Sequence, residues 1–127
     1  MLLKSFIRQS VRSNEMQVQE THCIESGLVF NVGAVSYRRR IMVPLLLALA
    51  PGGKSKAKHE LFFNGNSVAK AYAEGAVMPN GVSLGWSETK GWEGYIEANQ
   101  TATIEARMSS SEGGSTPSST TIYIGTA

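Results

Sequence analysis

Few residues of this chain are suited to nucleophilic, acid–base or metal chemistry: two histidines, one cysteine and ten acidic residues, all of them glutamate. His22 precedes Cys23, and His59 precedes Glu60. Neighbouring residues in a strand point to opposite faces, so His22 is not placed to activate Cys23 as a nucleophile. We interpret Cys23 as a small buried thiol. A zinc site needs three or four convergent ligands, and neither pair has such spacing, so we expect no catalytic residue, no metal and no cofactor.

Glutamates at positions 93, 97 and 105 are the best placed for paired acid and base chemistry of the kind used by glycosidases. Glu93 and Glu97 share one face of an expected strand, roughly 13 Å apart at a rise of about 3.3 Å per residue. This separation exceeds both glycosidase geometries. We therefore interpret the two carboxylates as the solvated side of that strand. The absence of aspartate further excludes an EF-hand loop and an Asp-dependent triad.

Three aromatic residues, Trp86, Trp92 and Tyr95, lie close together in the sequence. An exposed group of this kind is able to stack on a sugar ring or on a partner protein. Trp86 follows Val82 and Leu84 at a spacing of two, which favours burial in the core. Tyr95 shares the face of the glutamates and is the better candidate for an exposed contact.

Basic residues are concentrated in the first half of the chain. Residues 1–58 carry nine basic and three acidic side chains, a net charge of +6, whereas residues 59–127 carry three and seven, a net charge of −4. This distribution allows three outcomes: attraction between copies, binding of an anionic partner, or neutralisation within the fold. Runs at residues 37–40 and 54–58 could contact phosphates, but they form no recognisable nucleic-acid module and no phosphate-binding loop, so direct nucleic-acid contact is the less favoured alternative.

Alternating apolar and polar residues predict that most of the chain forms β-strands. We expect two strands within residues 16–32, one within 35–43, one at 59–63, one within 68–77, where a helix competes, and one at 121–125. Pro44 lacks a ladder donor and argues against a central strand beyond it, while residues 45–49 slightly favour a strand. Residues 79–108 read as a three-stranded β-meander with turns at 89–91 and 99–100.

These elements predict one all-β domain, an antiparallel β-sandwich or barrel that is jelly-roll-like or Ig-like, preceded by an N-terminal arm or short helix. We expect residues 1–14 to form a basic arm that is retained, and residues 15–127 to form the domain. Residues 109–121, rich in Ser, Gly and Thr, are expected to be a flexible loop. The apolar run at 41–50 is too short to cross a membrane, and a single cysteine forms no intrachain disulfide.

Together these features favour a non-enzymatic structural protein that functions by assembly. We expect a virion component assembled in the host cytoplasm, such as a bacteriophage capsid decoration (cementing) protein or a head or tail accessory protein. Its partners would be copies of itself, a major capsid protein or another virion protein, and not a membrane. The alternative is a carbohydrate- or ligand-binding β-sandwich module. The expected assembly interface comprises Phe6, Arg8, Arg12, Arg38, Arg39, Arg40 and Tyr95.

Overall fold

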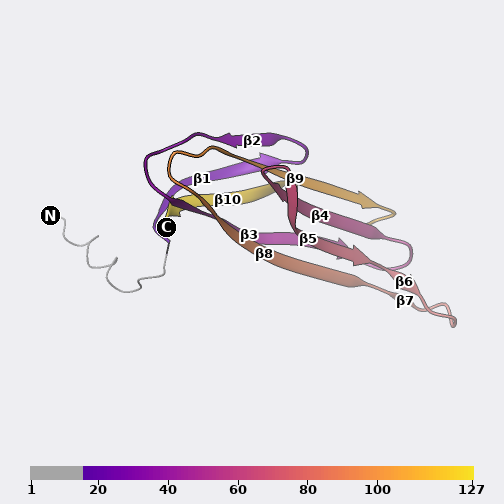
Figure 1. Cartoon of the computed structure of the whole chain (residues 1–127). Helices are drawn as coiled ribbons and strands as arrows, with labels where there is room; N and C mark the ends of the chain where they lie inside the picture. The colour runs from indigo at the N-terminus through magenta and orange to yellow at the C-terminus, as the bar shows by residue number, and fades with distance from the viewer. Residues whose placement is uncertain (1–15) are drawn as a thin grey trace.

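The protein is an all-β sandwich of two four-stranded antiparallel sheets, seen in a computed structural model that describes residues 16–127 (Figure 1). The expected basic arm, residues 1–14, lies outside the described residues. Sheet A contains β1 (Val18–Glu25), β10 (Ser119–Thr126), β3 (Arg39–Ala50) and β8 (Trp86–Ile96), in that order. Sheet B contains β2 (Val29–Val32), β9 (Ala102–Ser111), β4 (Lys56–Phe63) and β5 (Asn66–Glu74).

The strand pairing follows the jelly-roll scheme, one of the two sandwich types expected. Leaving aside the small hairpin of β6 (Ala76–Val77) and β7 (Ser83–Leu84), the pairs β1–β10, β2–β9, β3–β8 and β4–β5 nest inside one another along the chain, as in a long hairpin. Two further pairs, β10–β3 and β9–β4, join the nested pairs within each sheet. All six pairs are antiparallel, and this folded hairpin is the jelly-roll arrangement.

Strand β3 is central in sheet A and continues through Pro44 to Ala50, contrary to the expectation that the proline would limit a central strand. The missing donor is tolerated because the register with β8 shifts between Val43 and Leu46, leaving Pro44 outside the paired positions. On its other side, the pairing of β3 with β10 ends at Met42. The proline therefore lies where the ladder is already interrupted.

The expected meander over residues 79–108 is wrong. Residues 89–91 make no turn, because β8 runs unbroken from Trp86 to Ile96 and places Gly91 beside the β3 irregularity, where a Cβ would lie 3.1 Å from the Pro44 carbonyl oxygen. The turn at Asn99, which has a φ of 64°, leads into β9 of the opposite sheet. Strands β8 and β9 are thus consecutive in sequence but belong to different layers.

A third element, the hairpin of β6 (Ala76–Val77) and β7 (Ser83–Leu84), extends past the end of the sandwich in Figure 1. A turn at residues 79–81 forms its tip, where Gly81 has a φ of 88°. At the other end of the chain, β9 continues to Ser111 and β10 begins at Ser119. The segment outside strands is therefore 112–118, shorter than the loop expected at 109–121.

The core is built from unequal contributions of the two sheets. Sheet A supplies large branched side chains, whereas sheet B supplies several alanines that leave room for them. The fully buried large apolar side chains are Ile41, Val43, Leu46, Ile122 and Ile124 from sheet A and Leu61 and Ile104 from sheet B. The buried alanines of sheet B are Ala57, Ala71, Ala73, Ala102 and Ala106. Large residues facing small ones allow the layers to interdigitate at close-packed density.

One buried histidine connects the two sheets. His59 of β4 is fully buried; its Nδ1 accepts a hydrogen bond from the Leu47 amide of β3 at 3.1 Å, and its Nε2 lies 2.7 Å from Thr120 Oγ1 of β10. Since Nδ1 accepts, Nε2 carries the proton of the neutral ring and donates a hydrogen bond to Thr120 Oγ1. Burial lowers the pKa of His59 below its usual value, so the ring is neutral near pH 7.

Candidate interaction surfaces

The outer face of sheet A carries exposed and half-exposed apolar side chains along β3 and its neighbours. We define the apolar face as the outward side chains of β3, β8 and β10 that are uncharged and large: Met42, Leu45, Leu47, Leu49, Tyr95 and Tyr123. These residues alternate with the buried core positions of the same strands, so they point away from the interior. Leu45 is 50% exposed and Leu49 is 42% exposed. An apolar strip along a central strand is more typical of a contact surface than of a solvated face.

Three of the expected interface residues meet beside the apolar face. Arg38 lies over the Tyr95 ring, 4.0 Å from its centroid, and its Nε donates to Glu97 Oε2 at 3.1 Å. Arg40 donates to both carboxylate oxygens of Glu93, at 3.0 and 3.1 Å. Tyr95 is 43% exposed, as expected. These basic groups of the first half of the chain are thus neutralised by acids of the second half.

Arg39 does not belong to this surface. Its side chain points inward with Ile41, is 2% exposed, and donates through Nη2 to the Gly33 carbonyl oxygen at 2.6 Å. Its Nε has no partner among the described residues. The remaining expected interface residues, Phe6, Arg8 and Arg12, lie outside the part of the chain that the structure describes.

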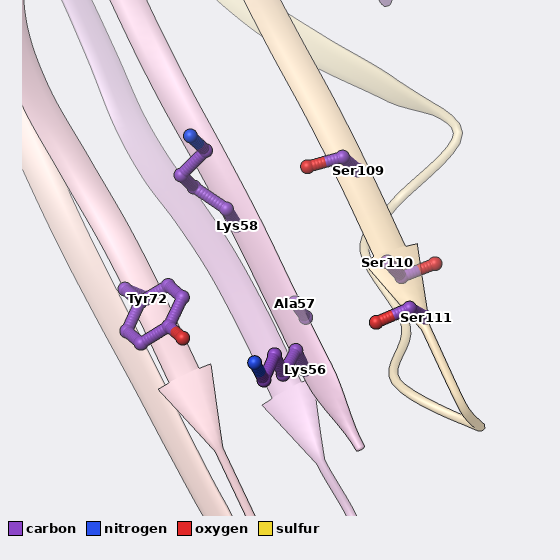
Figure 2. Close-up of a pocket in the computed structure, with 7 residues that line it drawn as sticks. All are labelled: Lys56, Ala57, Lys58, Tyr72, Ser109, Ser110 and Ser111. Atoms are coloured by element: carbon purple, nitrogen blue, oxygen red, sulfur yellow. The ribbon is translucent and has the colours of Figure 1, made fainter. Parts of the chain in front are cut away.

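The outer face of sheet B is charged and hollowed. A cavity of about 250 Å³ lies over β4, β5 and β9. Figure 2 shows the side chains that line it, among them the hydroxyl groups of Ser109 and Ser111 and the ammonium groups of Lys56 and Lys58. Its lining residues are Lys56, Ala57, Lys58, Tyr72, Ser109, Ser110 and Ser111. Lys56 Nζ lies 4.0 Å from Glu74 Oε2, and Lys58 Nζ lies 3.9 Å from Glu60 Oε1. Both ammonium groups therefore already have an acidic neighbour within the chain.

The groups around this cavity are suited to polar contacts. The Tyr72 hydroxyl donates to Glu74 Oε1 at 2.9 Å, and this hydrogen bond raises the pKa of the tyrosine. Tyr72 therefore remains protonated at neutral pH. The cavity's serines, which lie on β9, are not paired with a histidine base, since His59 on the neighbouring strand β4 points into the core.

The residues considered first for nucleophilic chemistry do not converge. His22 Nε2 lies 2.8 Å from Glu20 Oε1, and its ring packs on Phe30 with centroids 4.2 Å apart. Cys23 is exposed, which corrects the expectation of a buried thiol. It points to the outer face of sheet A because its neighbour Ile24 takes the inward position. The separation of His22 from Cys23 onto opposite faces agrees with the sequence argument.

A second hollow, not foreseen from the sequence, lies where β3 ends and β8 begins. It has a volume of about 480 Å³ and is lined by Leu49, Ala50, Pro51, Gly85, Trp86 and Ser87. Trp86, expected in the core, is 60% exposed. Its partner Ala50 is the last paired residue of β3, so Trp86 stands beyond the end of the packed layers. The available signal was the absence of charge from residues 75–87.

Within residues 16–127, no group of three or more His, Cys, Asp or Glu side chains is arranged to hold a metal ion. The described residues also include no helix long and apolar enough to cross a membrane. No known family model matches the chain, and a comparison with curated proteins finds no match.

Proposed function

We propose that this protein is a non-enzymatic structural component of a virion, such as a bacteriophage capsid decoration protein or a head or tail accessory protein. The observation that carries the proposal is the apolar face: a central strand of the sandwich presents leucines outward, with Leu45 half exposed. A partner that covers this face would remove apolar surface from water at about 25 cal/mol per Å².

Two further features support assembly over catalysis. Jelly-roll sandwiches are used in viral capsid domains, although the same fold also serves lectins and cupins, so the fold alone assigns no function. The reactive side chains are dispersed: His22 and Cys23 face opposite ways and His59 is buried. The contact surface would consist of the apolar face together with Arg38 and Arg40, whose charges are balanced by Glu97 and Glu93.

The direct test is to look for the protein in particles. Antibodies against the full chain are expected to label particles purified from cells that produce it, and mass spectrometry should find it at a fixed ratio to the main shell protein. Replacing Leu45 by glutamate should remove it from the particles, whereas Leu28→Glu, at a 57% exposed turn position outside this face, should not. Recovery of the wild-type protein only in the particle-free fraction would contradict the proposal.

The contribution of the arm is tested separately, by deleting residues 1–13. We expect attachment to weaken, because Phe6, Arg8 and Arg12 are proposed interface residues. If the shortened chain attaches to particles as well as the full chain does, the arm is not part of the interface. The proposal would then rest on the apolar face alone.

The exposure of Trp86 favours a second candidate, a carbohydrate-binding module. An indole that is 60% exposed at the edge of an apolar hollow is able to stack on a sugar ring. A glycan array followed by titration calorimetry distinguishes the two functions. Binding of a glycan that is lost in Trp86→Ala, by a protein absent from particles, would favour the module.

A further inference from the structure

The β6–β7 hairpin exposes apolar side chains on a segment without charge. No Lys, Arg, Asp or Glu occurs in residues 75–87. Val77 is 59% exposed, Val82 50% and Leu84 46%. Such a concentration of exposed apolar side chains on a projecting element indicates a contact that the single chain does not complete.

The hairpin is fixed at its base, so it does not depend on a flexible linker. Ser55 is fully buried, and its carbonyl oxygen accepts a hydrogen bond from the Gly75 amide at 2.9 Å where the hairpin begins. Where it ends, a Cβ at Gly85 would lie 2.6 Å from the Pro51 carbonyl oxygen, so only glycine permits this close approach. The hairpin therefore leaves the sandwich in a defined direction, away from the body (Figure 1).

An apolar hollow lies at the same end of the molecule. It is the 480 Å³ hollow between the end of β3 and the start of β8, and its walls include Leu49, Pro51 and Trp86. Because the hairpin points away from the body, the chain's own tip does not fill it. One molecule thus carries both a projecting apolar element and an apolar recess.

We infer that the hollow of one molecule receives the hairpin of a second copy of this chain, in a two-fold contact in which each molecule inserts its hairpin, residues 76–84, into the other. A two-fold contact uses the same patch on both partners, which requires the patch to be complementary to itself. The hairpin and the hollow lie at the same end of the molecule and both expose apolar side chains, so they match in polarity. This inference rests on the proposed assembly function and names one of its partners.

Charges at the border of the patch fit a second copy better than a strongly acidic or basic partner. Lys54 is exposed in the turn that holds the hairpin, and it makes no ion pair among residues 16–127. Glu74 and Glu88 border the uncharged segment on its two sides. A border with both signs is able to pair with its own copy, whereas a partner of one sign would be repelled at part of it.

Sedimentation equilibrium of the full-length protein tests the inference. We expect a monomer–dimer equilibrium in the micromolar range, weakened at least about tenfold by Val82→Ser and by Leu84→Ser. Val29→Ser is the matched control, because Val29 has similar exposure, 52%, and lies on β2. Circular dichroism melting of each variant shows whether it is folded. A protein that remains monomeric to millimolar concentration, or one whose dimer is unaffected by the hairpin changes, would overturn the inference.

Photocrosslinking tests the geometry independently. With Asn80 at the hairpin tip replaced by p-benzoylphenylalanine, in a mixture of ¹⁴N- and ¹⁵N-labelled protein, we expect mixed-isotope crosslinks to peptides containing residues 49–51 or Trp86. Crosslinks confined to other surfaces would contradict the exchange of hairpins.

These experiments on dimerisation can be distinguished from the test of the proposed virion function. If the protein is incorporated into particles but stays monomeric in solution, the proposed structural function is kept, and the inference that a second copy fills the hollow is overturned. A dimer formed through the hairpin by a protein absent from particles would support this inference and contradict the virion assignment.

Discussion

The two sheets of the sandwich differ on both of their faces. Inside, sheet A contributes branched side chains such as Ile41 and Leu46, and sheet B contributes alanines. Outside, sheet A presents the apolar face, whereas sheet B presents lysines, glutamates and Arg107, which pairs with Glu105 at 3.0 Å and covers the Phe62 ring. The outer face of sheet B is therefore mainly charged, whereas that of sheet A combines the apolar face with the Arg38–Glu97 and Arg40–Glu93 ion pairs.

This difference separates stability from interaction. A single alternating pattern in β3 provides core packing at Leu46 and an exposed apolar position at the adjacent Leu45. In sheet B the outward positions of β4 are occupied by Lys56, Lys58 and Glu60, which add little to stability and keep the face in water. The comparison leads us to expect that the apolar side chains on the outside of sheet A contribute little to folding, which the next comparison tests.

The largest expected effect compares the two faces within one strand. Leu46→Ala should lower the free energy of unfolding by about 2–5 kcal/mol, because a fully buried leucine leaves a cavity. Leu45→Ala, one residue away and half exposed, should change it by less than about 0.5 kcal/mol. Urea unfolding followed by tryptophan fluorescence measures both. Equal losses in the monomer would show that Leu45 is part of the core and that the outer face is not free.

A somewhat smaller effect is expected where the sheets are joined by His59. His59→Leu removes the acceptor of the Leu47 amide and the donor to Thr120, leaving buried polar groups unpaired. The expected loss is about 2–4 kcal/mol, since each unsatisfied buried group costs about 1–3 kcal/mol. The matched control is Lys58→Leu, at the neighbouring outward position of β4. A stable His59→Leu protein would mean that the hydrogen bonds across the layers contribute little.

The same histidine gives the fold a pH dependence. Burial lowers the pKa of His59 from its usual value of 6.5, so between these two pKa values the unfolded chain binds a proton that the folded chain does not. The free energy of unfolding therefore falls as the pH decreases through 6.5, by at most about 1.4 kcal/mol per pH unit. Urea midpoints between pH 8 and pH 5.5 should show this slope in the His22→Gln background and lose it in His22→Gln/His59→Leu. A persisting slope would assign the titration to another group.

Much of the fold could be predicted from alternation, because inward and outward residues differ clearly in β4 and β10. The meander could not, since residues 89–91 have turn-forming types but lie opposite the irregularity at Pro44, a tertiary feature absent from any local window. Likewise, Pro44 was judged as a single residue, whereas its tolerance depends on where β10 leaves β3.

The candidate surfaces were predicted in part. Tyr95 could be placed on an exposed face because Glu93 and Glu97, two residues away on either side, lie on the same face of the strand. Trp86 could not, because alternation assigns a side of the strand and does not reveal that the sandwich ends before that position. Cys23 shows the same limit, since small apolar character did not distinguish the outer face of β1 from its inner face.

The smallest expected effect compares the ion pairs of the two outer faces. Arg40 forms two hydrogen bonds with Glu93 and its side chain is 19% exposed, whereas Lys56 and Glu74 are 4.0 Å apart and both about half exposed. Double-mutant cycles with alanine should give a coupling of about 0.5–1 kcal/mol for Arg40–Glu93 and about 0–0.3 kcal/mol for Lys56–Glu74, because solvent and side-chain entropy weaken the exposed pair. Raising the salt concentration to about 0.5 M should reduce the exposed coupling to within error, since the screening length then falls to about 4 Å. Equal couplings would mean that the charges on both faces are solvated alike, and that the contrast between the sheets lies in their apolar residues alone.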